Sequence, residues 1–395
     1  MGVMAASFIV AACRTPIGKM LGNLSTAAAP QLGAVVIREA MSRAGIAPEQ
    51  VDEVVMGNVL SAGIGQAPAR QAALDAGCSP TVAALTINKM CGSGLKAVML
   101  ADQSIRVGDT RVVAAGGMES MSRAPHLLMN TRLGWKFGHQ EVVDSMLHDG
   151  LWCAQEQVVM GCLADATAGE NQISREEQDA FAVASHRRAI DAIESGRMTA
   201  ETVPVEIRKR AKTVSVTRDE GPRADVTLES LAALRPAFDR DGTATAGNAS
   251  QISDGAAAVI VVDEATAGDI KTNLKARIVA TAVSGVAAKD LFIAPVLAMK
   301  QVLDRAGMSV ADLDLIELNE AFASQALACL RPLGLDHDKV NVNGGAIALG
   351  HPIGASGARV LTTLLYALAE RDLEVGMAAL CLGGGNAVAI IVQRV

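Results

Sequence analysis

Aromatic residues are scarce in this 395-residue chain, which contains six Phe, two Trp and one Tyr. The sequence also lacks an apolar run of ~18 residues, so no membrane-spanning helix is expected. Its first ten residues lack a basic stretch, an apolar region of signal length and a following cleavage site, which argues against a secretory signal. Residues 7–11 are instead predicted to form the first strand. An Ala-, Val- and Gly-rich chain of this kind favours tightly packed α/β layers over a β-sandwich.

The cysteines are few and scattered. They stand at Cys13, Cys78, Cys91, Cys153, Cys162, Cys329 and Cys381. Their number is odd and no two have the spacing of a metal finger or a redox motif, so no metal site is predicted. With no secretory signal, we expect reduced thiols and a cytoplasmic location.

Charge is unevenly distributed. The net charge of −7 argues against a general affinity for nucleic acid or for membranes. Residues 186–223 are locally basic, with nine Lys or Arg against six Asp or Glu. This segment is either a solvated, ion-paired surface or a binding surface for a polyanionic ligand, and charge alone favours the first interpretation.

Strand and helix patterns alternate along most of the chain, and its length predicts two or three packed units. Strands are predicted over residues 51–59, 86–87, 112–115, 256–262, 277–283, 314–318, 377–382 and 388–392. Helices are predicted over residues 34–44, 65–76, 94–107, 295–306, 321–330 and 354–370. This rhythm is typical of parallel βαβ units with buried strands.

Residues 118–250 interrupt the alternation, and their one clear helix begins at a capping box formed by Ser174 and Glu177. On either side of the interruption, the segments CGSGLKAVML (91–100) and IGASGARVLT (353–362) resemble each other. Each is a turn of small residues followed by an Ala-, Leu- and Val-rich helix. A duplicated α/β half with a long insertion after the first copy accounts for this pattern.

Cys91 and His351 are candidate catalytic residues in glycine-rich turns. A thiol at a helix N-terminus faces free backbone N–H groups, which favour the thiolate, although an isolated cysteine is more often a small buried apolar residue. His351 is either a base and an oxyanion donor or a cap for the following helix, and the two interpretations weigh about evenly.

Two further candidates stand at strand ends. Cys381 precedes Gly383 and two more glycines, whose N–H groups suit an enolate or thioester oxygen, although a core cysteine before a turn is the simpler interpretation. Asn319 is placed to orient water or a ligand, but helix capping is locally the better explanation. Together with Cys91 and His351, these residues stand where open α/β sheets place their active sites.

The chain resembles the thiolase family over nearly its whole length. The resemblance rests on NKMCGSGLKAV, GGMESMSRAPH, LRPAFDRDGTATAGNASQISDGAAA, NEAFA, NVNGGAIALGHPIGASGARVL and CLGGGNA, in the order and spacing of the family. It implies a fold of two similar five-layered α-β-α-β-α halves with a loop domain inserted in the first. The corresponding boundaries are 1–120 plus 251–272, 121–250 for the CoA-binding and tetramerisation insertion, and 273–395. A homodimer or homotetramer is also implied.

The resemblance assigns a role to each candidate. Cys91 would carry the acyl group, His351 would activate it, and Cys381 would move the proton at the α-carbon. Asn319 would hold a water that forms one oxyanion hole with His351, and the backbone N–H groups of Cys91 and Gly383 would form the other. Arg223, Ser230 and Ser250 match family positions that contact coenzyme A (CoA).

The sequence departs from the family pattern at two places. Val159 stands where the family usually has a histidine in the pocket loop. Phe292 stands in a segment where the family usually has a Gly-x-Gly-Pro turn. Both departures put the acyl-chain preference and turnover of the enzyme in question.

The expected activity is CoA-dependent thiolysis of a 3-ketoacyl-CoA, the reverse Claisen condensation, or both, with CoA as a substrate and no cofactor. A decarboxylating ketosynthase is one alternative, and Cys381 counts against it. A catalytically weak or silent acyl-CoA-binding paralogue is the other, and the four intact catalytic positions count against that.

Overall fold

A computed structural model describes residues 6–209 and 212–395, and it shows two α/β halves built on one mixed sheet. The strand order is β14-β15-β16-β13-β1-β12-β5-β3-β4, with β2 beside β12. The first half comprises β1 (Ser7–Arg14), β2 (Gly18–Lys19), α1 (Ala29–Ala44), β3 (Glu53–Gly57), α2 (Pro68–Ala76), β4 (Ala83–Ile87), α3 (Ser93–Arg106), β5 (Val112–Ser120), β12 (Ser253–Asp263) and α7 (Glu264–Asp269). The second half comprises β13 (Ala276–Gly285), α8 (Ala294–Ala306), β14 (Leu315–Leu318), α9 (Ala323–Leu333), α10 (Ala346–Leu349), α11 (Ser356–Glu370), β15 (Val375–Leu382) and β16 (Asn386–Arg394).

The two halves repeat one order of main elements, which confirms the predicted duplication. Where the first half has β4, the described residues of the second have only the isolated parallel bridge of Ile316 with Val340. In each half, the last two strands of the repeat are neighbours in the sheet, β5 with β12 and β15 with β16. The segments CGSGLKAVML and IGASGARVLT lead into α3 and α11, which occupy equivalent places and pack against each other. Among the described residues, the half-sheets pair through Phe8 with Arg277 and Ile9 with Ala276.

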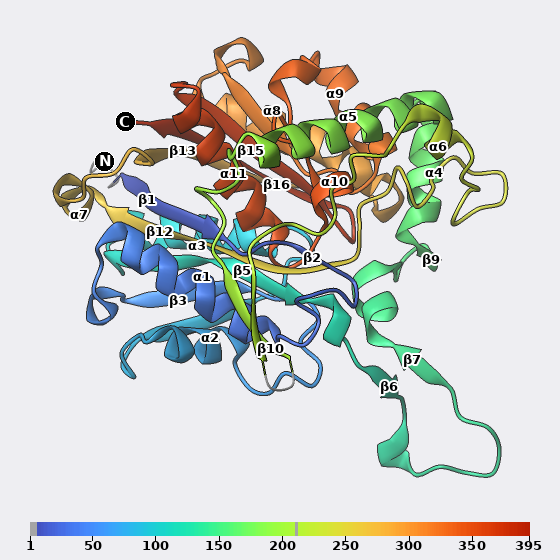
Figure 1. The fold of residues 1–395 in the computed structure, drawn as a ribbon, viewed down its shortest axis with the longest axis horizontal. Coiled ribbons are helices and arrows are strands. Elements are labelled where there is room, and N and C mark those ends of the chain that lie inside the picture. Colours follow the sequence, from blue (N-terminus) through green and yellow to red (C-terminus); the bar gives the residue numbers. More distant parts are fainter. Residues whose placement is uncertain (1–5, 210–211) are drawn as a thin grey trace.

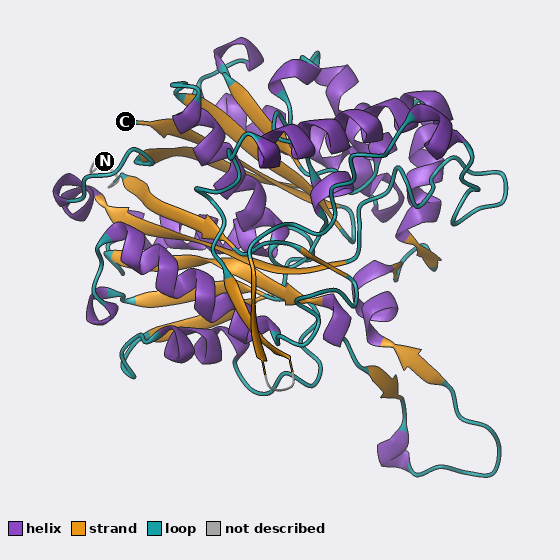
Figure 2. Ribbon diagram, in the orientation of Figure 1, coloured by secondary structure: helices purple, strands orange, loops and turns teal. Residues whose placement is uncertain are grey.

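The α-β-α-β-α layering is confirmed, and the two halves build the five layers together. Helices α1 and α2 cover the outer face of the first half-sheet, and α8 covers that of the second. Helices α3 and α11 lie between the half-sheets, where they are buried on most sides (Figures 1 and 2). The central helices therefore connect the two cores.

The sheet is mixed, whereas the strand and helix rhythm predicted parallel units. β3 is parallel to β4 and β5, and β14 is parallel to β15, as expected for strands joined by a helix. The pairs β5–β12, β1–β12, β1–β13, β13–β16 and β15–β16 are antiparallel. In the second half, β16 follows β15 after the short turn of residues 383–385, so the two strands form an antiparallel hairpin. In the first half, β12 follows the insertion and also runs antiparallel to β5.

The insertion occupies residues 121–252, between β5 and β12. It contains β6 (His126–Leu128), β7 (Val142–Asp144), β8 (Trp152–Cys153), β9 (Val158–Val159), α4 (Met160–Glu170), α5 (Arg175–Glu194), β10 (Val205–Lys209), β11 (Lys212–Val216) and α6 (Leu228–Ala232). The capping box at Ser174 and Glu177 is confirmed at the start of α5. The predicted domain boundaries at residues 120, 250 and 272 stay predictions.

Glycines allow the two halves to approach closely behind the candidate site. A Cβ on Gly117 would overlap the carbonyl oxygen of Gly354, one on Gly57 would lie 2.8 Å from that oxygen, and one on Gly94 would lie 2.7 Å from the amide nitrogen of Ala358. Gly117 lies within β5, although the sequence predicted that this strand ends before it. A glycine inside a strand marks a close approach of another backbone, and here that backbone belongs to the other half.

We predict that Gly117→Ala destabilises the protein by about 1–3 kcal/mol, because the added methyl group overpacks this contact. Denaturant unfolding would measure the change. Gly169→Ala in α4 is the control, since its Cβ meets no atom within 4 Å and the free energy of unfolding should fall little or rise. Equal stability of wild type and Gly117→Ala would contradict the prediction.

Candidate active site

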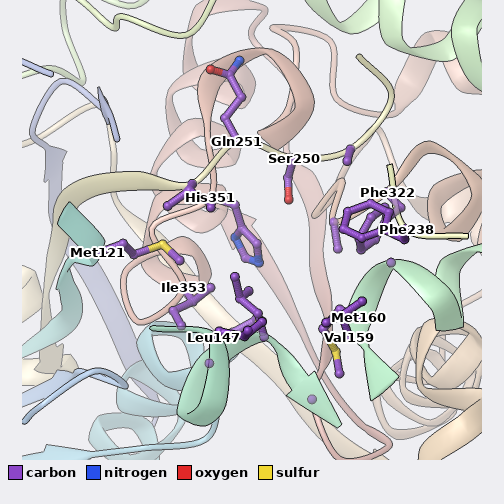
Figure 3. Close-up of a pocket in the computed structure, with 18 of the residues that line it drawn as sticks. Met121, Leu147, Val159, Met160, Phe238, Ser250, Gln251, Phe322, His351 and Ile353 are labelled. Atoms are coloured by element: carbon purple, nitrogen blue, oxygen red, sulfur yellow. The ribbon is translucent and has the colours of Figure 1, made fainter. Parts of the chain in front are cut away.

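One cavity of about 500 Å³ brings residues from both halves and from the insertion together. Cys91, His351, Cys381, Gly383 and Ser250 all line it. Figure 3 shows the His351 ring pointing into the cavity, between Met121 on one side and Phe322 and Phe238 on the other. Five of the eight residues predicted from the sequence therefore share one enclosed space.

Cys91 is half-buried in the turn between β4 and α3. The preceding residue, Met90, has a φ of 48°, which is unusual for a residue with a side chain. Such a backbone conformation is frequent at active sites, where the surrounding structure holds it. The Cys91 side chain lines the cavity and also packs against an apolar cluster that includes Ile353.

The Cys91 thiol is neutral at pH 7, contrary to the expectation of a favoured thiolate. Burial raises its pKa to about 11, while the backbone N–H groups of Gly383 and of Cys91 itself act in the opposite direction. The buried Glu119 carboxylate contributes to the increase. Thiolate formation in this site therefore requires a base.

His351 is an uncharged imidazole that lines the same cavity as Cys91. Burial, together with the charge of Arg359, lowers its pKa to about 3. Its Nδ1 lies 2.6 Å from the hydroxyl of Ser356, which itself donates to the carbonyl of Pro352 at 2.9 Å. The hydroxyl therefore accepts the Nδ1 hydrogen, so Nε2 carries a lone pair and is the acceptor atom of the ring. His351 does not cap α11, whose N-cap is Ala355.

Asn319 follows β14 and contacts the imidazole. Its amide nitrogen lies 3.5 Å from Nε2 of His351, and its buried Oδ1 has no hydrogen-bond partner among the described residues. The capping interpretation is wrong, because α9 begins after Phe322. The side chain instead presents an unsatisfied acceptor beside the histidine, as a residue that binds a polar group would.

Cys381 lies near the end of β15 and is 1% exposed. Burial raises its pKa well above the ordinary thiol value, and the thiols of Cys91 and Cys329 add to this effect. Cys381 and Cys91 both line the cavity. A thiol with a raised pKa is a proton donor when neutral and a strong base when ionised.

Of the three residues predicted to bind CoA, one lines the cavity. This residue is Ser250, whose amide nitrogen donates to the carbonyl of Ala321 at 3.0 Å. Arg223 and Ser230 are exposed on the insertion and are not among the cavity-lining residues. Ser230 donates to the Thr227 carbonyl within α6, and the Arg223 amide nitrogen donates to Nδ1 of His186.

Both departures from the family pattern lie in the cavity wall. Val159 precedes α4, and Phe292 is 2% exposed in a short 3₁₀ helix. The Phe292 ring packs edge-on against Phe322 at 5.3 Å, and Phe322 packs similarly against Phe238 at 5.9 Å. Three of the few aromatic residues in the chain therefore form one wall beside the reacting groups.

Glu119 was not singled out from the sequence. It is the last residue but one of β5 and is fully buried. Its carboxylate accepts hydrogen bonds from backbone N–H groups of both halves. The one sequence signal that pointed to Glu119 was its place in the family segment GGMESMSRAPH. The donors that converge on its carboxylate are distant in the sequence, so no local pattern reveals them.

Comparisons with known proteins identify the family of this chain. Residues 7–265 match the model of the thiolase N-terminal domain, and residues 272–394 match that of the thiolase C-terminal domain. The acetyl-CoA acetyltransferases of Pseudomonas aeruginosa and Escherichia coli are 51% and 52% identical over 387 residues, which cover 98% of this chain and 98% of each relative. The chain belongs to the thiolase family. A crystal structure of the Bacillus anthracis acetyl-CoA acetyltransferase has a TM-score of 0.97, with 42% identity and complete coverage of both chains.

No described helix is long and apolar enough to cross a membrane. Within residues 6–209 and 212–395, no group of three or more His, Cys, Asp or Glu side chains is arranged to hold a metal ion.

We predict that the Cys91 thiol reacts increasingly with iodoacetamide as the pH rises past 9.0, the ordinary thiol value, because its own pKa is about 11. The alkylation rate should rise roughly tenfold per pH unit up to about pH 10, since the thiolate is the reacting species. Mass spectrometry of the Cys91 peptide would follow the reaction, with N-acetylcysteine as the reference thiol. A rate that levels off below pH 9 would contradict the raised pKa.

Proposed function

We propose that this protein catalyses CoA-dependent thiolysis of a 3-ketoacyl-CoA and the reverse Claisen condensation of acetyl-CoA with an acyl-CoA. The observation that carries the proposal is the shared cavity, in which a thiol and a neutral imidazole from two turns meet a second thiol from the end of β15. The names of the relatives support acetyl-CoA as one substrate. CoA enters as a substrate, and the proposed chemistry needs no metal or additional cofactor.

In the first step, Nε2 of His351 accepts the proton of Cys91, and the thiolate attacks the keto carbonyl of the substrate. The backbone N–H groups of Cys91 and Gly383, which already interact with the sulfur, are placed to stabilise the oxyanion. The carbon–carbon bond then breaks, leaving an acyl group on Cys91 and the enolate of acetyl-CoA.

In the second step, Cys381 protonates the enolate carbon, and acetyl-CoA departs. The raised pKa of Cys381 suits this role, because its thiolate is basic enough to remove the same proton in the condensation direction. His351 and Asn319, through a water, stabilise the enolate oxygen. The thiol of CoA then gives its proton to the Cys381 thiolate and attacks the acyl group. The Cys91 thiolate that departs takes back the proton held by His351, so all three groups return to their starting state.

CoA is proposed to reach the cavity along the insertion. Ser250 would contact the pantetheine arm inside the cavity. Arg223 and Ser230 are exposed on the same insertion and would contact the nucleotide end, where a guanidinium can bind phosphate. This assignment favours the ligand-binding interpretation of the basic segment.

The two alternatives receive no support from the comparisons. A decarboxylating ketosynthase has no use for a second thiol in the cavity, where Cys381 lies. A silent acyl-CoA-binding paralogue would not require Cys91, His351 and Asn319 to keep their mutual arrangement.

Thiolysis can be tested with CoA and a panel of 3-ketoacyl-CoAs, by following loss of the ketoacyl absorbance and trapping the acyl-enzyme by mass spectrometry. We expect turnover and acyl label on Cys91, and Cys91→Ala should lose roughly 10³-fold or more in kcat, as expected when a covalent nucleophile is removed. No turnover with any chain length, or label on another residue, would overturn the proposal.

Two cysteine variants refine this test. Cys381→Ala should still become acylated at Cys91 by acetyl-CoA but should fail to condense. Cys162→Ala is the matched control, because Cys162 is a half-buried thiol of α4 outside the cavity lining. Normal condensation by Cys381→Ala would remove the proton-transfer role of Cys381.

We also propose that the protein assembles as a homodimer that pairs into a homotetramer. Strand β4 pairs with β3 and lies at the edge of the sheet, and Leu85 on it is 42% exposed. An open strand edge is suited to pairing with a second copy.

The hairpin of β6 and β7 extends from the body (Figure 1), and its tip exposes Leu133 by 84% and Trp135 by 56%. Such apolar exposure is typical of a protein interface.

Light scattering would test this assembly with a double variant, Trp135→Ser with Phe137→Ser. The wild type should have the mass of four chains and the variant that of two, because the hairpin contact is lost. Leu297→Ser, which removes a 40%-exposed leucine of α8, is the control and should leave the mass unchanged. A variant that keeps the wild-type mass would contradict the role of the hairpin.

A cytoplasmic location and a role in fatty acid metabolism complete the proposal. All seven cysteines are free, and the mechanism requires two of them as thiols, which a reducing compartment maintains. Cleavage of 3-ketoacyl thioesters is the chemistry by which acyl chains are shortened.

A further inference from the structure

Glu119 is a buried carboxylate that lies outside the cavity lining. Its Oε1 accepts hydrogen bonds from the side-chain amide of Asn58 at 2.7 Å and the backbone N–H of Leu60 at 3.2 Å. Its Oε2 accepts from the backbone N–H groups of Val59 at 3.0 Å and Gly354 at 2.9 Å. Four donors therefore saturate the carboxylate, which is more than packing alone would require.

These donors belong to two segments from different halves of the molecule. Residues 58–60 follow β3 in the first half, and Gly354 lies in the turn that runs from His351 to α11 in the second. Val59, Leu60 and Ile353 pack together in one apolar cluster, against which Cys91 also packs. Glu119 thus lies directly behind the part of the wall that contains the proposed nucleophile.

The turn from His351 to Ser356 is held at both ends. At its start, the backbone N–H of His351 donates to the Gln251 carbonyl at 2.9 Å, and Nδ1 contacts Ser356. In its middle, Glu119 binds the N–H of Gly354. A Cβ at this position would lie 2.6 Å from Oε2 of Glu119, so glycine allows the carboxylate its close approach.

The charge of Glu119 is stabilised chiefly by peptide groups. Burial raises its pKa to about 7, the N–H groups of Val59, Leu60 and Gly354 oppose that increase, and Asp254 adds to it. The same carboxylate raises the pKa of the Cys91 thiol. Removing the charge should therefore affect both the position of the loops and the ionisation of Cys91.

We propose that Glu119 is a positioning residue for the thiolase reaction, which binds the His351 turn of one half to the Cys91 side of the other. It acts through Gly354 and the 58–60 loop, and it sets the separation between the imidazole and the thiol. The proposal rests on the function proposed above. One carboxylate would thereby align reacting groups that come from both halves.

Glu119→Gln tests the proposal, because it replaces one acceptor oxygen with an NH₂ group that faces two donors. We expect kcat to fall roughly 10- to 100-fold, since a small misplacement of reacting groups has effects of this size. KM for the 3-ketoacyl-CoA should change by no more than about twofold, because Glu119 does not line the cavity. Glu119→Asp keeps both oxygens and should recover part of kcat.

Asp102→Asn is the matched control. Asp102 is 4% exposed and accepts hydrogen bonds from Ser7 and Arg106, so this variant also replaces a buried carboxylate with an amide. It lies on α3, about 14 Å along the helix from the Cys91 end. We expect a lower melting temperature in both variants, but a loss of kcat only in Glu119→Gln.

Two measurements that need no turnover separate this proposal from the proposed function. In Glu119→Gln, backbone hydrogen exchange should increase in peptides covering residues 58–60 and 351–357, and the pH profile of Cys91 alkylation should move to lower pH. If the wild type shows no thiolysis, the proposed function fails while these measurements still decide the role of Glu119. Unchanged exchange and alkylation, or an equal loss of kcat in Asp102→Asn, would overturn the positioning role.

Discussion

The close approach of two backbones is the constraint on which the rest of the structure depends. Gly57, Gly94 and Gly117 of the first half meet Gly354 and Ala358 of the second, where a Cβ on any of those three glycines would collide with backbone atoms. The reacting groups come from both sides of this contact, since Cys91 belongs to the first half and His351, Asn319 and Cys381 belong to the second. A shift between the halves would therefore separate the nucleophile from its base.

Burial sets the protonation states that the chemistry requires. The same desolvation that raises the pKa values of Cys91 and Cys381 lowers that of His351, so all three groups are neutral at rest. A neutral imidazole can accept a proton, and two neutral thiols can each supply one. Cys91, His351 and Cys381 therefore form no ion pair before the substrate binds. Charge develops during the reaction, beside the N–H groups and side chains that can stabilise that charge.

Local sequence predicted much of the fold and of the candidate site. Helices α1 and α8 end at residues 44 and 306, where the sequence predicted, and the paired turn motifs lead into equivalent helices. The failures concern non-local contacts. Gly117 lies within β5 because of its neighbour in the other half, Asn319 faces an imidazole 32 positions away, and burial outweighs the helix N-terminus at Cys91. Arg223 and Ser230 were identified by resemblance alone, and the cavity does not include them.

The two halves differ most in how their last two strands are joined. In the second half, Gly383 to Gly385 make a short turn whose first N–H group reaches Cys91, whereas residues 121–252 fill the equivalent connection in the first. Selection can therefore act on the two connections independently. The short turn contacts the reacting thiol, so it tolerates little change. The long connection can change in sequence to admit new acyl groups while the groups that make and break bonds stay in place.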